Sequence, residues 1–228
     1  KVPVIEPSDS AEALDFVKEA FEISEKYGTP VILRSTTTLS HSRGCVQEGE
    51  RLDLGRTIRF EKDPMRHVPI PAWARTMRLR LIERLGKLQE AASESHLNRV
   101  EWKDRRVGII THGVTYQHVR EVFPEASVLK LGWCYPWPDK LFREFASEVD
   151  QVIVIEELED LIEEHVKAIG ISCVGKKLND EELVPRAYEI NVDVLLKVRA
   201  RLTKAGLYPF EPIALMTPKK DNPNKGNI

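Results

Sequence analysis

Residues 34–44, RSTTTLSHSRG, concentrate side chains that could bind an anionic ligand. Guanidinium, hydroxyl and imidazole groups suit a carboxylate or a phosphate. The stretch directly follows the apolar run 31–33, which we interpret as a buried strand, and ligands gather at the carboxyl ends of strands in open α/β sheets. Alternatively, its hydroxyls satisfy backbone groups at a polar strand exit. The substrate- or cofactor-facing candidates are Arg34, Thr36, Thr37, Thr38, His41 and Arg43.

Other side chains capable of chemistry follow apolar runs later in the chain. Thr111-His112-Gly113 ends one run but lacks the three glycines of a dinucleotide fingerprint, so we expect His112 at a turn or an interface. Residues 132–138, GWCYPWP, are typical of a packing corner or a subunit interface, and Cys134 has no base beside it in the sequence. Glu156 and Glu157 close another run, where either could contact a partner domain. The interface candidates are His112, Tyr116, Tyr135, Trp137 and Glu157.

Composition argues against several classes of function. The formal net charge of −2 gives no general attraction to nucleic acid or to anionic lipid. No apolar run approaches the ~20 residues that cross a bilayer, so we expect neither nucleic acid nor a membrane as a partner. Cys45, Cys134 and Cys173 are far apart in the sequence. Their spacing predicts neither a disulfide framework nor a metal or iron–sulfur site formed by this chain alone. The cysteine pattern fits a reducing cytoplasm.

The elements that must position these residues alternate regularly from about residue 105 onward. Short apolar runs at 107–111, 127–131, 151–155 and 171–174 are separated by helical patterns at 114–123, 139–148 and 158–169. Strands that alternate with helices at this spacing predict an α/β fold, in which a parallel sheet carries helices on both faces. Residues 181–205 predict one further helix.

The first 104 residues are less regular. A helix is predicted to begin near Asp9 and to end at Gly28, and its two apolar lines predict that most of its sides are covered. Residues 39–71 are predicted to be irregular and 72–94 helical, with a solvated face formed by Arg75, Arg78, Arg80 and Arg84. Because one helix and one strand cannot form a domain, residues 1–40 should pack on the later domain or on a second copy.

Several stretches, taken in order, resemble one enzyme family. PVILRSTTT and SHSRG are followed by NRVEW, then YPWP, then VIEELE. Residues 4–178 together are similar to the large subunit of indolepyruvate:ferredoxin oxidoreductases, within the 2-oxoacid:ferredoxin oxidoreductases. The resemblance implies that residues 1–44 are the C-terminal part of a thiamine pyrimidine-binding domain. It also implies a linker and helix at 45–104 and a domain similar to the transketolase C-terminal domain at 105–205. We expect residues 206–228 to form a disordered tail.

The family activity implied by the resemblance is oxidative decarboxylation of an aryl pyruvate to an arylacetyl-coenzyme A, with ferredoxin as the electron acceptor. It implies thiamine diphosphate, Mg²⁺, 4Fe–4S clusters and coenzyme A for the parent enzyme. It also implies an oligomer, with the other domains of the same subunit, a small beta subunit and ferredoxin as partners. None of these cofactors is expected to bind this chain alone.

The sequence departs from a complete large subunit in ways that bear on its function. It lacks the acidic residue that activates the thiamine ring, a CPGCPHR-like segment and the cysteine-rich ferredoxin module. We therefore expect an internal fragment that is inactive when isolated and mainly structural, and the resemblance assigns no catalytic residue to it. One alternative is a stand-alone, non-catalytic binding or assembly module. Another is a parent enzyme that acts on pyruvate, 2-oxoglutarate or branched-chain acids.

Overall fold

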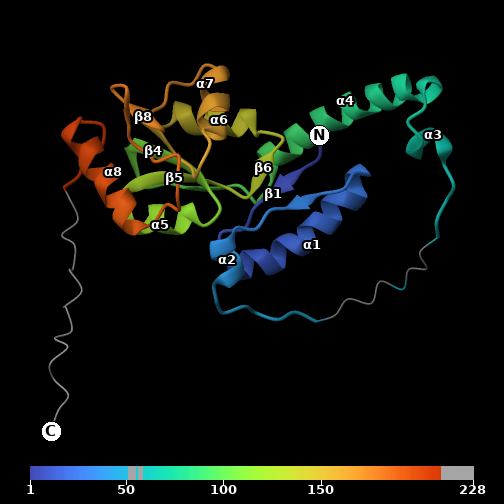
Figure 1. Cartoon of the computed structure of the whole chain (residues 1–228), viewed down its shortest axis with the longest axis horizontal. Coiled ribbons are helices and arrows are strands. Elements are labelled where there is room, and N and C mark those ends of the chain that lie inside the picture. The colour runs from blue at the N-terminus through green and yellow to red at the C-terminus, as the bar shows by residue number, and fades with distance from the viewer. Residues whose placement is uncertain (51–54, 56–58, 212–228) are drawn as a thin grey trace, which may run out of the picture.

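The structure is a computed structural model that describes residues 1–50, 55 and 59–211. An α/β module built from residues 99–211 lies beside an N-terminal unit, and a long helix extends away from both (Figure 1). The predicted tail at 212–228 and part of the irregular stretch, at 51–54 and 56–58, lie outside the described residues.

The α/β module is built on a sheet with strand order β3-β5-β4-β7. β4 pairs in parallel with both β5 and β7, as the alternating pattern predicts, whereas β3 pairs antiparallel with β5 at one edge. The strands are β3 (Arg99–Glu101), β4 (Asp104–His112), β5 (Ala126–Leu131) and β7 (Gln151–Ile155).

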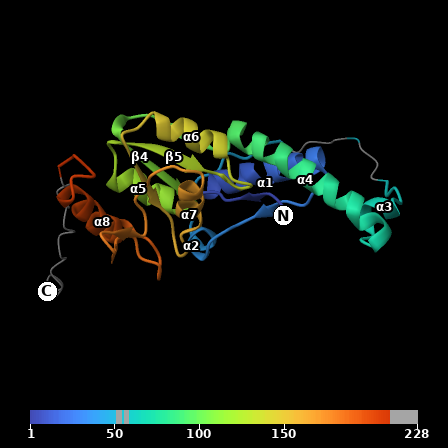
Figure 2. The ribbon, with the colours of Figure 1, turned by 90° about the horizontal axis from the view of Figure 1, so that it is seen from above.

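Helices cover both faces of this sheet, as the sequence predicts. Apolar side chains of α5 and α8 pack on one face around Ile109 and Val128, and those of α6 and α7 pack on the other around Ile110 and Leu129. In Figure 1, α6 and α7 lie above the sheet and α5 lies below it, and Figure 2 shows the module from above with α6 and α8 on opposite sides of the strands. Burial on both sides is why these strands are almost uniformly apolar. The helices are α5 (Thr115–Val122), α6 (Asp139–Ser147), α7 (Leu161–Ala168) and α8 (Val192–Lys204).

The N-terminal unit is joined to the module through backbone pairing. β1 pairs in parallel with β2 and antiparallel with β6, a short strand that belongs to the module, so the sheet order is β2-β1-β6. This pairing confirms that residues 1–40 pack on the later domain. The elements are β1 (Val4–Ile5), α1 (Ser10–Tyr27), β2 (Ile32–Leu33), α2 (Thr37–His41) and β6 (Trp133–Tyr135).

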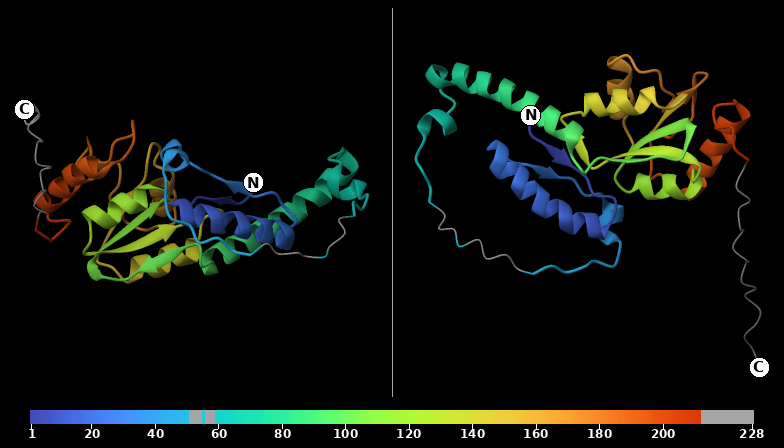
Figure 3. Two further views of the ribbon diagram at one scale, coloured as in Figure 1. Left: turned by 90° about the horizontal axis from the view of Figure 1, so that it is seen from below. Right: turned by 180° about the vertical axis from the view of Figure 1, so that it is seen from behind.

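The long helix α4 (Pro71–Glu94) follows the short helix α3 (Pro64–His67) and confirms the predicted helix at 72–94. The C-terminal half of α4 packs on α1 through a cluster that includes Phe16, Ile23, Leu88 and Ala92. The N-terminal half extends past the end of α1 together with α3, as both views in Figure 3 show.

Several expectations for individual elements are wrong. The helix predicted at 181–205 begins only at Val192, because residues 181–182 pair with 177–178 as β9 (Glu181–Glu182) and β8 (Lys177–Leu178), and Tyr188 has a φ of +68°. Residues 171–174 form only a bridge between Val174 and Ile153.

Burial also differs from the sequence prediction in three places. The run at 31–33 is not buried, since Ile32 is 50% exposed at the edge of its sheet. The second apolar line of α1 is uncovered, with Phe21 67% exposed. Conversely, residues 206–211 pack on the module: Tyr208 is fully buried and its hydroxyl donates a hydrogen bond to Glu125.

Candidate functional site

Five of the predicted site residues meet at one cavity of about 340 Å³. Arg34 follows β2, His112 ends β4, and Tyr135 and Trp137 lie at the end of β6 and just beyond it. Glu157 follows β7. The cavity thus lies where strands of both sheets end, the position at which α/β sheets bind ligands. Its lining also includes Val4, Glu6, Cys134, Glu156, Leu158 and Leu161.

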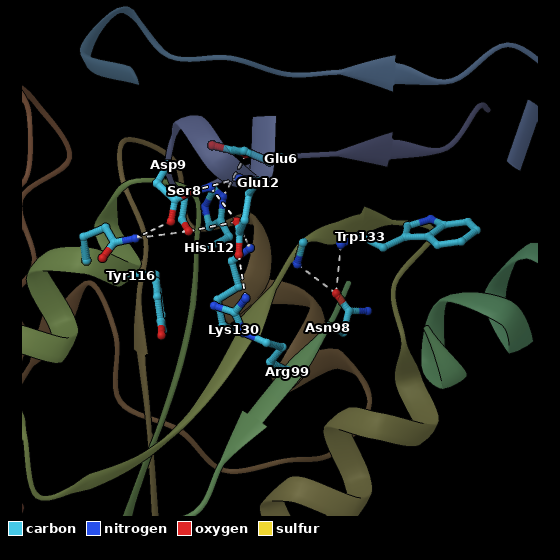
Figure 4. A network of polar contacts seen from close by, with 12 residues as sticks. Glu6, Ser8, Asp9, Glu12, Asn98, Arg99, His112, Tyr116, Lys130 and Trp133 are labelled. Atoms are coloured by element: carbon cyan, nitrogen blue, oxygen red, sulfur yellow. Dashed lines mark hydrogen bonds and ion pairs between the residues drawn. The ribbon is translucent and has the colours of Figure 1, made fainter. Parts of the chain in front are cut away.

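Glu6 is the centre of the polar contacts in this cavity. Its carboxylate Oε2 accepts hydrogen bonds from Arg34 Nη1 at 2.8 Å and from His112 Nδ1 at 3.0 Å, and its side chain is only 3% exposed. Burial alone would raise the pKa of Glu6, but the His112 hydrogen bond and charge, and then Arg34, outweigh it and lower that pKa. Glu6 is therefore a buried carboxylate that bridges two cations, Arg34 of the N-terminal unit and His112 of the α/β module. Figure 4 shows Glu6 and His112 within the polar network.

Gly113 is what allows Glu6 to approach so closely. Its φ of +54° lies in the left-handed region, and a Cβ atom there would lie 2.4 Å from Glu6 Oε1. The Thr-His-Gly turn therefore serves to admit the carboxylate. Any larger residue at 113 would push Glu6 away from His112.

His112 is held in its charged form. Burial favours the neutral ring, but hydrogen bonds to Cys134 and Glu6 and the charge of Glu6 raise the pKa of His112 to about 10. At neutral pH the ring is therefore an imidazolium, a hydrogen-bond donor and a positive charge. It cannot act as a general base until it loses that proton.

Glu156 and Glu157 have structural partners. The Glu156 carboxylate accepts hydrogen bonds from the backbone N–H groups of Ile162 at 2.8 Å and Glu163 at 2.9 Å, at the N-terminal end of α7. Burial raises the pKa of Glu156 although these bonds oppose it. Glu157 accepts from the backbone N–H of Ile190 at 3.1 Å. Both carboxylates therefore hold neighbouring segments in place beside the cavity.

Glu6, His112 and Cys134 also form a set of potential metal ligands, with one ligand atom from each lying within 4.8 Å of the others. Carboxylate, imidazole and thiol together would suit zinc. However, the Arg34 guanidinium already occupies the same carboxylate oxygen at 2.8 Å, and a metal would have to displace the proton through which His112 donates to Glu6. The geometry therefore favours an ion-pair network over a metal centre.

A second network joins α1 to the α/β sheet behind the cavity. Glu12 lies at capping-box distance from the helix cap Asp9, but its carboxylate turns to Ser8, whose N–H and hydroxyl donate at 2.8 and 2.9 Å. The same carboxylate accepts from Lys130 Nζ at 2.5 Å and from Arg99 Nη1 at 2.8 Å. Lys130 is fully buried, so this ion pair lies inside the joint between the two parts (Figure 4).

Comparison with known proteins identifies relatives over most of this chain. It is 40% identical over 215 residues to the indolepyruvate oxidoreductase subunit IorA of Methanothermobacter thermautotrophicus, and 38% identical over 216 residues to that of Archaeoglobus fulgidus. These matches cover 90% and 92% of this chain and 34% of each relative. The chain is similar to one part of the IorA subunit. It spans about a third of that subunit's length, and no family model matches it.

The fold is shared with a solved enzyme. The 2-oxoglutarate:ferredoxin oxidoreductase from Magnetococcus marinus superimposes with a TM-score of 0.60 at 17% identity, over 90% of this chain and 42% of that one. This similarity confirms the α/β fold predicted from the sequence. Within the described residues, no helix is both long enough and apolar enough to cross a membrane.

The other predicted site residues lie away from the cavity lining. Thr36 caps α2 by accepting from the Leu39 N–H at 3.2 Å, and the Thr38 hydroxyl donates to Glu189 at 3.1 Å. Tyr116 lies on α5, where its hydroxyl donates to Glu101. Thr37, His41 and Arg43 are not among the cavity-lining residues, and all three are exposed. Their predicted roles at a cofactor or an interface remain predictions.

Glu6 and Cys134 are the residues that sequence reasoning missed as members of the site. Glu6 follows a strand of only two residues, too short to show any periodicity. The one available signal was an acidic residue directly after the apolar pair Val4-Ile5 and before Pro7. The sequence places no partner beside Cys134, because His112, its hydrogen-bond partner, is distant in sequence and close only in space.

Proposed function

We propose that this chain is part of a 2-oxoacid:ferredoxin oxidoreductase that acts on aryl pyruvates. The overall reaction converts aryl pyruvate, coenzyme A and two oxidised ferredoxins into arylacetyl-coenzyme A, carbon dioxide, two reduced ferredoxins and a proton. The observation that carries the proposal is the 38–41% identity to IorA subunits, which extends over 83–92% of this chain. The family likeness supports thiamine diphosphate, iron–sulfur clusters and coenzyme A as the cofactors of the parent.

The described residues do not fit those cofactors by themselves. An iron–sulfur cluster needs several converging thiolates, whereas Cys134 and Cys173 are buried and Cys45 is exposed at a distance in sequence. Mg²⁺ prefers an octahedron of oxygen ligands, whereas the set Glu6, His112 and Cys134 offers oxygen from Glu6 only. The carboxylate of Glu6 is already bound to Arg34 and His112. We therefore propose that other segments of the parent hold these groups.

The role we propose for this chain is structural, as an interface. β2 forms an edge of the β2-β1-β6 sheet, and its Ile32 is 50% exposed. Phe21 and Val17, on the helix α1 that contacts β2, are exposed at 67% and 41%. Exposed apolar side chains beside an open strand edge favour further pairing or packing. Other domains of the same subunit, a small beta subunit or a second copy are the proposed occupants of this surface.

Arg34 is the residue of this chain that we propose contacts the substrate. It donates to Glu6 through Nη1 alone, its side chain remains 45% exposed, and it lines the cavity together with Tyr135 and Trp137. A guanidinium beside aromatic rings suits an aryl-substituted carboxylate.

The test is an assay of the intact parent complex with ferredoxin as acceptor. Indolepyruvate, phenylpyruvate, pyruvate, 2-oxoglutarate and 2-oxoisovalerate are compared in the presence of coenzyme A. We expect the highest kcat/KM for the two aryl pyruvates and no turnover by the present chain alone. Preference for a small or dicarboxylic substrate contradicts the aryl-pyruvate assignment. Absence of any 2-oxoacid-dependent reduction favours a non-catalytic assembly module instead.

A further inference from the structure

A second cavity, far from the candidate site, is lined by three arginines. It has a volume of about 240 Å³ and lies between the C-terminal end of α1, the end of α3 and the N-terminal half of α4. Its lining consists of Tyr27, Gly28, Arg66, Met77, Arg80 and Arg84. None of these residues is acidic, so the wall of the cavity carries a formal charge of +3.

The helix geometry explains how the arginines converge. Met77, Arg80 and Arg84 are spaced three and four residues apart, which places them on one face of α4. Arg66 reaches the same place from α3, and a Cβ atom on Gly28 would lie 2.6 Å from its Nη2. The left-handed glycine that ends α1, with a φ of +58°, therefore leaves room for a guanidinium.

The end of α1 neutralises only part of this charge. Arg84 Nη1 donates to the carbonyl oxygen of Gly28 at 3.2 Å, and a helix C-terminus carries roughly half a negative charge. The lining therefore retains roughly two and a half positive charges. Arg84 Nε is also buried and has no hydrogen-bond partner in the part of the chain that the structure describes. A buried donor without a partner is costly, so the hydrogen bonding of the Arg84 guanidinium is incomplete within the described chain.

We propose that this cavity, defined by Arg66, Arg80 and Arg84, binds a phosphate group, either as the free ion or as a phosphate monoester. Guanidinium groups bind phosphate through paired, charge-assisted hydrogen bonds. The volume holds about eight water molecules at ~30 Å³ each, enough for a phosphate group and a small substituent. It is smaller than the roughly 300–1,000 Å³ of sites that enclose whole drug-sized ligands. The proposal does not depend on the proposed enzymatic function.

The experiment is a titration of the full chain, in phosphate-free buffer of constant ionic strength, with inorganic phosphate and separately with ribose 5-phosphate. Binding is followed by the NMR signals of the arginine Nε–H groups. We expect saturable shifts of Arg84 Nε–H, with potassium chloride producing none. Tighter binding of ribose 5-phosphate identifies a phosphate ester as the natural ligand, and tighter binding of the inorganic ion identifies free phosphate.

Variants make the test specific to this cavity. Arg84→Gln should weaken phosphate binding by about tenfold or more, the usual effect of removing a hydrogen bond to a charged group. Because Arg84 also supports the end of α1, Arg80→Gln serves as a second variant and should weaken binding in the same direction. Arg78→Gln is the matched control, since it removes the same charge from α4 but lies outside the cavity lining.

Three results would overturn the proposal. One is the absence of saturable shifts up to the solubility limit of phosphate. Another is an equal loss of affinity in Arg78→Gln and Arg80→Gln, which indicates attraction to net charge alone. The third is displacement of phosphate by a poly-glutamate peptide that binds more tightly, which indicates docking of an acidic protein instead.

Discussion

Replacement of Glu12 by Gln should destabilise the protein more than replacement of its partner Lys130 by Met. Lys130 is fully buried and its Nζ lies 2.5 Å from Glu12 Oε2, so Glu12→Gln leaves an ammonium group without its anion. Removing one partner of a buried ion pair costs roughly 3–5 kcal/mol. Burial lowers the pKa of Lys130 although the charge of Glu12 opposes this shift. In Glu12→Gln the buried ammonium can therefore lose its proton, which keeps the destabilisation within this range.

Lys130→Met leaves a better-satisfied group behind. Glu12 keeps Arg99 Nη1 at 2.8 Å and both donors of Ser8, so the loss is that of one charged hydrogen bond, roughly 1.5–3 kcal/mol. The double variant replaces the buried pair by neutral groups, and we expect it to be more stable than Glu12→Gln alone.

The assay is thermal and urea unfolding of the full chain, followed by circular dichroism. For a chain of 150–250 residues each kcal/mol shifts Tm by about 2–4 °C, so Glu12→Gln should lower Tm by roughly 6–20 °C. Glu83→Gln is the matched control: it makes the same chemical change in an exposed pair with Lys87 and should leave Tm unchanged. The reasoning is refuted if Glu12→Gln matches this control, or if Lys130→Met is the more damaging of the two variants.

Three further predictions concern other parts of the fold. The pKa of His112 is raised from 6.5 to about 10, so its contribution to stability should be complete below about pH 6.5 and lost as the pH rises to about 10. The difference in urea-unfolding free energy between wild type and His112→Gln should shrink over that window. A difference that stays constant contradicts the raised pKa. Gly132→Ala should lower the free energy of unfolding by about 1–3 kcal/mol, because a Cβ would lie 2.4 Å from the Leu97 carbonyl oxygen. Gly86→Ala, on an open face of α4, should raise it by about 0.5–1 kcal/mol. Equal effects of the two variants on Tm would show that the backbone around Gly132 relaxes freely. Labelling of the native protein with a thiol reagent should show one fast phase, from Cys45, because Cys134 and Cys173 are buried and burial raises the pKa of Cys173 to about 11. Cys45→Ser should abolish that phase. A fast phase that survives in Cys45→Ser identifies a reactive buried thiol.

The sequence predicts the elements that are long and periodic. The runs at 107–111, 127–131 and 151–155 are mainly apolar because helices cover both faces of the sheet, and this signal does not depend on distant residues. β1 and β2 contain two residues each and are strands only because they pair with each other and, for β1, with β6. The predicted helix at 181–205 begins too early because the sequence does not reveal the hairpin of β8 and β9. The turn of this hairpin, Asn179 and Asp180, has positive φ values without a glycine that would mark it.

The candidate site divides in the same way. The sequence predicts Arg34 as a ligand-facing candidate because it follows a predicted strand, and the rule that ligands gather at strand ends needs only local sequence. For His112 it predicts only a turn or an interface, and the structure lines the same cavity with both residues. That they share Glu6 could not be predicted, because the contact between Glu6 and His112 spans 106 residues. Helical spacing predicts a solvated face for the arginines of α4. It cannot predict that Gly28 and Arg66, from other elements, line a cavity together with Arg80 and Arg84.

The two polar networks place the candidate site and the joint between the parts of the molecule on the same short segment. Glu6 and Glu12 both belong to the N-terminal unit, and each binds a cation of the α/β module, His112 at the end of β4 and Lys130 on β5. A variant of His112 therefore changes the cavity and weakens docking together. Arg34 lies outside the module, so Arg34→Met alters the cavity while the Glu12–Lys130 pair is kept. Loss of parent-enzyme activity in Arg34→Met with little change in Tm would indicate a direct role for the cavity, whereas parallel losses in both variants, scaled to Tm, would indicate that docking alone matters.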